Sequence, residues 1–308
     1  MSFLYYYIRS MRLYYAFVTG STVLAGLVLG AGENGVTWNW QTLLALVAGY
    51  LIWGVNQIFN DWSGLAEDRI NAPHRPMVCG KLPIVPALVL SLVLELLFGA
   101  IFCWINPWLL APLLVGVVLN LVYSWLKGWP IVGCLVYGAA ISCCFLFGII
   151  LACPQGIVFP HGTWNWFLVF VLIHALMCHF SYFKDVVGDG EAGKRTLQVV
   201  LGVKRAFWLV EIPTVFLLLL YWSQIFQIGN WPLMFGIAVS AVLFGLLSLQ
   251  MATDCSKKIM VSTCLNCLLC TALSLLPVLA VDPGLWPIFP VSLVLILVIF
   301  NWYRDEKE

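Results

Sequence analysis

The chain alternates between long apolar segments and short polar ones. Ten apolar runs have roughly the 20 residues that a membrane-spanning helix needs. They cover approximately residues 14–32, 41–60, 84–105, 107–126, 131–153, 164–184, 205–226, 231–250, 260–280 and 285–302. The runs lack the two-residue alternation of membrane strands, and an open sheet edge is not stable in lipid. The pattern therefore predicts an all-α fold.

Composition places this fold in a lipid bilayer. The mean hydropathy is +0.98, and only 9% of the residues are charged, whereas soluble proteins have about a quarter. We therefore expect a polytopic membrane helical bundle that forms a single domain over residues 1–308. The net charge of +1 and the lack of a long basic run argue against a nucleic-acid partner.

The basic residues predict the topology of the bundle. With ten spans, all 15 Lys and Arg residues fall on one side of the membrane, which the positive-inside rule makes cytoplasmic. They are Arg9, Arg12, Arg69, Arg75, Lys81, Lys127, Lys184, Lys194, Arg195, Lys204, Arg205, Lys257, Lys258, Arg304 and Lys307. We expect a multi-pass protein of the cytoplasmic membrane, with both termini and the polar loops inside.

The densest polar segment follows the second apolar run, over residues 56–81 (NQIFNDWSGLAEDRINAPHRPMVCGK). Asp61 and Glu67 lie in it beside a set of residues that recur every four positions: Asn56, Asn60, Gly64 and Asp68. These four share one face if the preceding helix continues through the segment. Carboxylate and amide oxygens suit a hard cation such as Mg²⁺, so the segment predicts a metal site.

A second acidic segment follows the sixth apolar run, over residues 182–197 (YFKDVVGDGEAGKRTL). Asp185 and Asp189 lie one helical turn apart, and Lys194 and Arg195 come after them. Two acidic segments, each followed by basic residues, are what a metal-bridged diphosphate requires. Both lie on the predicted cytoplasmic side, where we expect them to converge over one cavity.

A third polar pair, Tyr123 and Lys127, ends the fourth apolar run with one helical turn between the two residues. Taken alone, the pair is equally well explained by an interfacial tyrosine and a lysine that extends to the membrane surface. Beside two acidic segments on the same side, it favours phosphate binding.

These three elements, in this order, resemble the motifs of the UbiA superfamily of intramembrane prenyltransferases. Members carry Asn-Asp-x-x-Asp-x-x-x-Asp after the second helix, Tyr-x-x-x-Lys after the fourth and Asp-x-x-x-Asp after the sixth. The matching residues here are Asn60, Asp61 and Asp68, continuing through Arg69, Asn71, Pro73, Arg75 and Pro76; Tyr123 and Lys127; and Asp185 and Asp189, continuing through Gly193, Arg195 and Thr196. The resemblance extends from the first span to about residue 205.

The resemblance implies a helical bundle around a central cavity, with Mg²⁺ between the aspartates and the diphosphate of an isoprenyl donor. Together with the hydropathy, it predicts about nine to ten transmembrane helices. The implied catalytic and metal-binding residues are Asn60, Asp61, Asp68, Asp185 and Asp189. The implied diphosphate-binding residues are Asn56, Arg75, Tyr123, Lys127, Lys194 and Arg195. Two features depart from the family. Gly64 stands where an aspartate is expected, with Asp61 or Glu67 as its candidate replacements, and the family usually shows nine spans rather than ten.

The implied activity is Mg²⁺-dependent transfer of an isoprenyl group from a prenyl diphosphate, through an allylic carbocation, to a small-molecule acceptor. Family frequency favours an aromatic acceptor. Aromatic faces stabilise such a cation by roughly 0.5–2 kcal/mol per contact. The aromatic residues nearest the motifs are Trp62, Tyr123, Trp125 and Tyr182, and the candidates to orient or deprotonate the acceptor are Asn120, His174 and His179.

Two other functions stay open. One is a terpene cyclase on the same scaffold, in which a double bond of the donor's own tail captures the cation. The other is a membrane transporter that uses the acidic residues as an ion path. Transporters usually place such residues near the bilayer midplane and show internal repeats, whereas the carboxylates here cluster near one membrane face.

Overall fold

The computed structural model describes residues 2–153, 156, 158–226, 231–252 and 259–304 of the 308. All regular structure in these ranges is helical, as predicted. The longer helices are α1 (Phe3–Met11), α2 (Ala16–Ala31), α3 (Trp40–Ser63), α4 (Leu65–Asn71), α5 (Ile84–Ile105), α6 (Leu110–Leu126), α7 (Val132–Ala152), α8 (Thr163–Ser181), α9 (Val186–Glu191), α10 (Leu197–Leu201), α11 (Val203–Phe226), α12 (Trp231–Ala252), α13 (Ile259–Val281) and α14 (Ile288–Arg304). Short 3₁₀ turns are η1 (Leu13–Tyr15), η2 (Gly32–Asn34), η3 (Pro107–Leu109), η4 (Tyr182–Lys184) and η6 (Pro283–Leu285).

Ten helical segments within the described ranges are long and apolar enough to cross a membrane, one for each predicted run. The first, Phe3–Asn34, begins earlier than predicted. It is interrupted at Arg12, whose left-handed backbone (φ 49°) separates α1 from η1 and α2.

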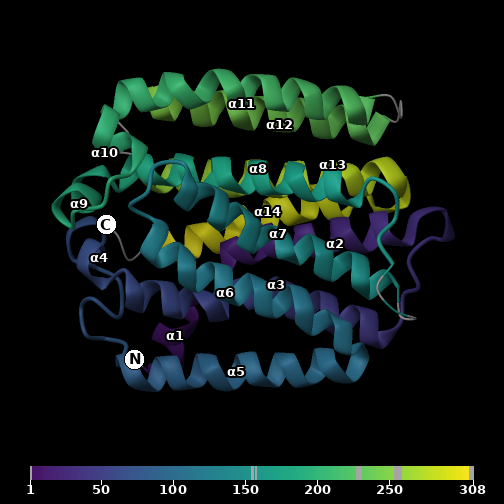
Figure 1. Cartoon of the computed structure of the whole chain (residues 1–308), viewed down its shortest axis with the longest axis horizontal. Helices are drawn as coiled ribbons and strands as arrows, with labels where there is room; N and C mark the ends of the chain where they lie inside the picture. The colour runs from purple at the N-terminus through teal and green to yellow at the C-terminus, as the bar shows by residue number, and fades with distance from the viewer. Residues whose placement is uncertain (1, 154–155, 157, 227–230, 253–258, 305–308) are drawn as a thin grey trace.

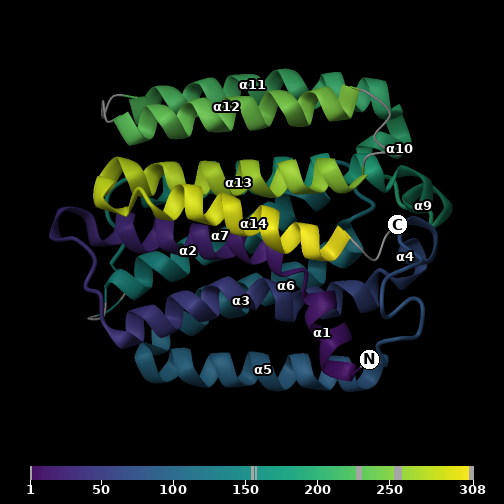
Figure 2. The same cartoon turned by 180° about the vertical axis from the view of Figure 1, so that it is seen from behind.

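The spans are arranged in layers (Figures 1 and 2). The hairpin of α11 and α12 forms the outer layer on one side, and α5 lies outermost on the opposite side. Between them, α2 contacts α3, α7 and α13, and α7 also packs against α6 and α8. About 83% of the apolar window of α13 is buried but only 11% of those of α5 and α6, so α13 is central and α5 and α6 face the lipid.

Glycines allow α2 and α7 to pack closely. A Cβ atom on Gly26 would lie 2.0 Å from the carbonyl oxygen of Phe145, and one on Gly148 would lie 2.1 Å from that of Val23. Any side chain at either position would collide with the backbone of the opposite helix. Small residues of this kind are the usual means of close helix packing in lipid.

The short helices α1, α4, α9 and α10 gather at one end of the bundle, at the left of Figure 1 and the right of Figure 2. The helix ends and loops that carry the described basic residues lie at this same end, as the charge placement predicted. Lys257, Lys258 and Lys307, which that prediction also used, lie outside the described residues.

Candidate active site

A polar pocket of about 890 Å³ lies at this end of the bundle, where α3 and α4 face η4 and the C-terminal end of α6. Its described lining contains eight charged side chains: Arg12, Asp61, Glu67, Asp68, Arg75, Lys127, Lys184 and Asp185. The two acidic segments, more than 100 residues apart in the chain, therefore reach one pocket. Four of the eight are carboxylates and four are cations, so the described lining is close to neutral at pH 7.

The first acidic segment bends at Gly64, so the predicted continuous helix is interrupted. α3 ends at Ser63 and α4 begins at Leu65, because Gly64 leaves helical geometry (φ −97°, ψ 14°). The helical hydrogen-bond spacing nevertheless continues. The Gly64 N–H donates to the Asn60 carbonyl at 2.9 Å, and the Asp68 N–H donates to the Gly64 carbonyl at 3.0 Å. Asn60, Gly64 and Asp68 consequently all line the pocket.

Asp61 is held by cations from two directions. Its buried carboxylate accepts a hydrogen bond from Gln57 Nε2 at 2.9 Å and forms an ion pair with Arg12. Arg75 lies 3.8 Å from Asp61 and forms an ion pair with Asp68. Arg12 was predicted only as a topology marker, because nothing in the sequence indicates that a residue 49 positions before Asp61 contacts it.

The second acidic segment, η4 and α9, also pairs its carboxylates with lysines. The Lys184 ammonium lies 3.0 Å from Asp185 Oδ1 and 2.8 Å from Oδ2. Asp189 is fully buried, and its Oδ1 lies 2.8 Å from the Lys127 ammonium. Asp189 Oδ2 is buried and has no hydrogen-bond partner among the described residues. Asp185 lines the pocket. Asp189 is not in that described lining, but it is paired with Lys127, which is.

The side chain of Asn71 joins the two segments. Its Nδ2 donates to the Asp185 carbonyl at 3.1 Å, and its Oδ1 accepts from the Gly188 N–H at 2.9 Å. These two bonds hold α4 against α9. The Asn71 side chain therefore ties the first acidic segment to the backbone of the second.

The pKa values of the two aspartates shift in opposite directions. Burial would raise the pKa of Asp185, but Lys184 and Lys127 outweigh it and lower that pKa below its usual 3.8. For Asp189, burial outweighs its partner Lys127, so its pKa is raised. Burial would lower the pKa of Lys127, but Asp189 and Asp185 outweigh it and raise that pKa. Lys127 therefore stays cationic at neutral pH.

The remaining predicted diphosphate-binding residues differ in position. Tyr123 and Lys127 line the pocket, and the hydroxyl groups of Tyr123 and Tyr182 lie 2.9 Å apart. Lys194 contacts the pocket's rim, 3.5 Å from Glu67 Oε1. Arg195 is exposed, and the described lining of the pocket does not include it. The contact of Arg195 with a diphosphate stays a prediction.

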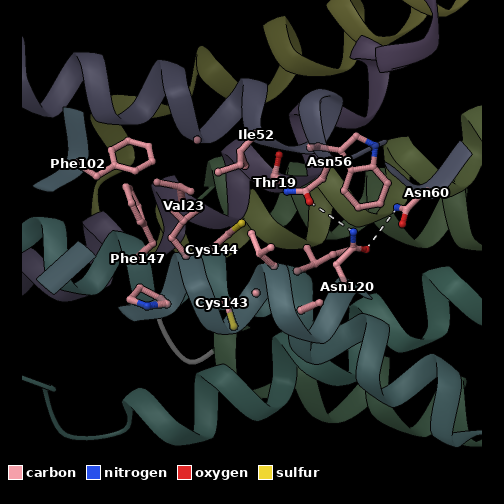
Figure 3. Close-up of a pocket in the computed structure, with 18 residues that line it drawn as sticks. Thr19, Val23, Ile52, Asn56, Asn60, Phe102, Asn120, Cys143, Cys144 and Phe147 are labelled. Atoms are coloured by element: carbon pink, nitrogen blue, oxygen red, sulfur yellow. Dashed lines mark hydrogen bonds between the residues drawn. The ribbon is translucent and has the colours of Figure 1, made fainter. Parts of the chain in front are cut away.

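A second pocket, the apolar chamber, lies beside the polar pocket and has a volume of about 660 Å³ (Figure 3). Trp53 and Asn60 line both spaces, so the two adjoin at these residues. The end nearer the polar pocket carries three amides: Asn56, Asn60 and Asn120. Asn60 Nδ2 donates to Asn120 Oδ1 at 3.3 Å, and Asn120 Nδ2 reaches Asn56 Oδ1 at 3.5 Å. The opposite end is closed by Phe102 and Phe147, whose ring centroids lie 4.7 Å apart.

Aromatic rings surround the junction of the two spaces. The Trp53 ring lies 5.1 Å from Tyr15 and 5.8 Å from Tyr137, and Tyr137 lies 5.1 Å from Tyr123, all between centroids. All four residues line the polar pocket. Two of the aromatics predicted for this role, Trp62 and Trp125, are 49% and 79% exposed. The other two, Tyr123 and Tyr182, line the polar pocket. Tyr15, Trp53 and Tyr137 were not predicted, because only folding brings them beside the motifs.

His174 and His179, the two histidines predicted to act on the acceptor, are not among the described residues that line the polar pocket or the apolar chamber. His174 is fully buried and contacts Thr22 Oγ1 at 3.3 Å and Ser142 Oγ at 3.2 Å, so it links α2, α7 and α8. His179 contacts Gln198. Of the three residues considered for orienting an acceptor, only Asn120 is placed at the junction.

The carboxylates fit a metal ion that is shared with a ligand. Among the described residues, no three His, Cys, Asp or Glu side chains are placed to hold a metal ion by themselves. Mg²⁺ commonly takes only one or two carboxylates and completes its coordination with water and substrate phosphates. The carboxylates of Asp61, Asp68 and Asp185 on the walls of the polar pocket match that arrangement. Asp189, whose Oδ2 has no partner among the described residues, is buried behind Lys127.

The chain is similar to several known proteins. The model of the UbiA prenyltransferase family matches residues 19–262. The digeranylgeranylglyceryl phosphate synthase of Methanospirillum hungatei JF-1 is 28% identical over 264 residues, which cover 82% of this chain and 89% of that protein. The enzyme of the same name from Methanoculleus marisnigri is 29% identical over 202 residues, 65% of this chain and 69% of that protein.

Solved structures show the same fold. A UbiA homolog from Aeropyrum pernix K1 has a TM-score of 0.67 at 17% identity, covering 88% of this chain and 98% of that chain. A UbiA homolog from Archaeoglobus fulgidus, bound to GPP and Mg²⁺, has a TM-score of 0.61 at 16% identity, covering 97% of this chain and 99% of that chain.

Proposed function

This chain belongs to the UbiA prenyltransferase family, and from that premise we propose that it transfers an isoprenyl group from a prenyl diphosphate to an acceptor in a Mg²⁺-dependent reaction. One observation carries the proposal. A pocket lined by paired carboxylates and cations adjoins an apolar chamber, and Asn60 and Trp53 line both. A prenyl diphosphate has the same division between a charged head and a greasy tail.

The extent of the chamber gives the expected length of the donor's tail. The lining of α3 runs from Gly49 to Asn60, which at 1.5 Å per residue is about 16 Å. An extended isoprenyl unit adds roughly 5 Å through four carbon–carbon bonds. We therefore expect a tail of about three units, ending at Phe102 and Phe147. The GPP bound to the Archaeoglobus homolog supports a donor of this class.

The residues that would hold Mg²⁺ are Asp61, Asp68, Asp185 and Asp189, with the Asn60 amide beside them. When bound, the metal supplies positive charge that stabilises the departing diphosphate. Arg75 and Lys127 line the pocket and would donate charge-assisted hydrogen bonds to the remaining phosphate oxygens.

The aromatic junction stabilises the cation that forms as the diphosphate leaves. The Trp53 ring lines both the charged pocket and the chamber, and the rings of Tyr15, Tyr123 and Tyr137 line the pocket beside it, where the first carbon of the tail would lie. Each well-placed face contributes roughly 0.5–2 kcal/mol. The Asn120 amide, which is already hydrogen bonded to Asn60, would orient the acceptor.

For the acceptor, the similar proteins favour an isoprenyl glyceryl phosphate. Their name, digeranylgeranylglyceryl phosphate synthase, describes a product with isoprenyl groups on a glyceryl phosphate. The cations Arg12 and Lys184 also line the pocket and suit an acceptor that carries a phosphate. The aromatic acceptor expected from family frequency is the other class to test. We place the charged end of the bundle on the cytoplasmic side, by the positive-inside rule.

The test is a transfer assay with the purified protein in lipid nanodiscs. Prenyl diphosphates of two to four isoprenyl units, with Mg²⁺, are combined with a geranylgeranylglyceryl phosphate, with an aromatic acid or with no acceptor, and products are identified by mass spectrometry. We expect the prenylated glyceryl phosphate, and none after chelation of the metal. A cyclic hydrocarbon formed without acceptor would identify a terpene cyclase. A protein inert toward every donor would contradict prenyl transfer.

A further inference from the structure

Lys184 occupies the position beside Asp185 that a metal ion would take. Its ammonium lies within 3.0 Å of both carboxylate oxygens, so it covers the edge of the carboxylate that a cation ligates. The two side chains are only 14% and 19% exposed, and both line the polar pocket. A divalent ion and an ammonium cannot share this edge without strong repulsion. Metal binding at Asp185 therefore requires Lys184 to move.

The other carboxylates of the site are neutralised in the same way. The described partners are Arg12 and Arg75 for Asp61, Arg75 for Asp68, Lys127 for Asp189 and Lys194 for Glu67. Without ligand, each acidic group that could attract a metal already has a cation of the chain beside it. The described carboxylates of the site are therefore all in ion pairs with cations of the chain, and none of them is free to bind a metal without an exchange of partners.

A diphosphate changes this balance because it offers new anionic partners to the displaced cations. Lys184 reaches the pocket on a flexible four-carbon stem, so it can leave Asp185 for a phosphate oxygen with little rearrangement of the backbone. The vacated carboxylate edge then accepts the metal. If no diphosphate is present, the displaced ammonium has no anion to pair with, and metal binding is opposed.

We infer that Lys184 is a resident counter-ion that competes with the metal for Asp185 and, once displaced, binds the donor's diphosphate, so that metal and diphosphate bind in a mutually dependent way. This role rests on the proposed function, and it makes Lys184 a diphosphate-binding residue of that site. It predicts opposite effects of removing the ammonium: metal binding alone is strengthened, and diphosphate binding is weakened. A lysine with a purely structural role would weaken both when removed.

The test is isothermal titration calorimetry on the full chain in detergent. Mg²⁺ is titrated into metal-free protein, and geranyl S-thiolodiphosphate, which resists cleavage, is titrated in saturating Mg²⁺. For Lys184→Met we expect the affinity for Mg²⁺ alone to rise roughly five- to tenfold and the affinity for the thiolodiphosphate to fall by a similar factor, within the usual range of binding couplings. Lys184→Arg, which keeps the charge, should retain both wild-type affinities more closely.

Lys204→Met is the matched control, because Lys204 is an exposed lysine at the start of α11, at the same end of the bundle. It should leave both affinities unchanged. Size-exclusion chromatography and thermal melting verify folding, and Lys184→Gln replaces the methionine variant if that one does not fold. Unchanged or weaker binding of Mg²⁺ alone after loss of the ammonium would overturn the inference. If wild-type protein binds no thiolodiphosphate, the proposed function fails, while the titration with Mg²⁺ alone still tests the competition.

Discussion

The polar pocket and the apolar chamber share Trp53 and Asn60 but bind a ligand by opposite means. In the polar pocket, every described carboxylate is paired with a cation of the chain, so a charged ligand binds by exchange of partners. The chamber has almost no polar lining beyond its amide end, so a tail binds by burial of apolar surface. The pocket should therefore control the rate, and the chamber should control which donor is used.

The largest expected effect comes from removing one carboxylate of the pocket. Asp185→Asn or Asp68→Asn should lower the transfer rate by about 100- to 1000-fold, because a preorganised charge at the leaving group is lost. Initial rates of product formation measured by mass spectrometry test this. Glu33→Asn is the control, since Glu33 is exposed and lies between α2 and α3 at the other end of the bundle. Near wild-type rates in both aspartate variants would show that the pocket is not the reaction site.

A change at the far end of the chamber should alter donor choice without stopping the reaction. Phe147→Ala removes one of the two rings that close the chamber, so longer tails gain room. We expect the ratio of kcat/KM for a four-unit donor over a two-unit donor to rise by roughly tenfold, a typical value for steric discrimination. Phe216→Ala, on a lipid-facing residue of α11 that is 63% exposed, should leave the ratio unchanged. If this kcat/KM ratio were the same in both variants, the chamber would not determine which donor is used.

Within the polar pocket, Asp185 and Asp189 should give metal-free protein opposite responses to acid. The pKa of Asp185 is lowered, so its ionised form adds stability above pH 3.8 that is lost as the pH falls through the folded-state pKa. The pKa of Asp189 is raised, so its ionised form costs stability. That cost disappears as the pH falls from the folded-state pKa toward 3.8.

Melting temperatures of the two asparagine variants, followed as the pH is lowered, measure these responses. The deficit of Asp185→Asn relative to wild type should shrink below pH 3.8. As the pH falls toward 3.8, the melting temperature of wild type should rise relative to that of Asp189→Asn. Each change should be about 1–3 °C. Parallel curves for the two variants would show that Lys184 and Lys127 do not distinguish the two carboxyl groups.

The smallest effect is expected at Gly64, where the family has an aspartate. A Cβ atom there would lie 3.1 Å from the Asn60 carbonyl oxygen and 4.0 Å from Asp68 Oδ2, so Gly64→Asp adds a carboxylate beside Asp68. With thiolodiphosphate present, Mg²⁺ affinity measured by calorimetry should rise by about fivefold or less, because water screens the new charge. Gly64→Asn is the neutral control, and an equal rise in both variants would contradict an electrostatic cause.

Much of the fold was predictable from the sequence because a membrane span is a local property. A run of about 20 apolar residues crosses the bilayer whatever its neighbours are, and all ten runs became helices that could span it. The candidate residues of the two acidic segments were predictable for a similar reason, since their spacing depends on one helical turn. Gly64 separates α3 from α4. In the sequence it stood out as a departure from the expected aspartate, but the interruption of the helix there was not predicted.

The partners of those residues were not predictable. Three contacts join segments that lie far apart in the chain. They are the ion pair of Arg12 with Asp61, the hydrogen bond of Asn71 with Asp185 and the ring contact of Trp53 with Tyr137. Each depends on which helices are neighbours and on how they are rotated. The exposed position of Arg195 likewise follows from the turn that ends α9.

By itself, the sequence determined that this protein is a membrane bundle of helices with acidic and basic groups concentrated at one end, because hydropathy and charge act residue by residue. Only the tertiary structure decided that these groups form closed pairs around one pocket and that a chamber of limited depth begins beside it. Pairing and depth depend on distances between helices, which packing at glycines such as Gly26 and Gly148 sets and which no local pattern encodes.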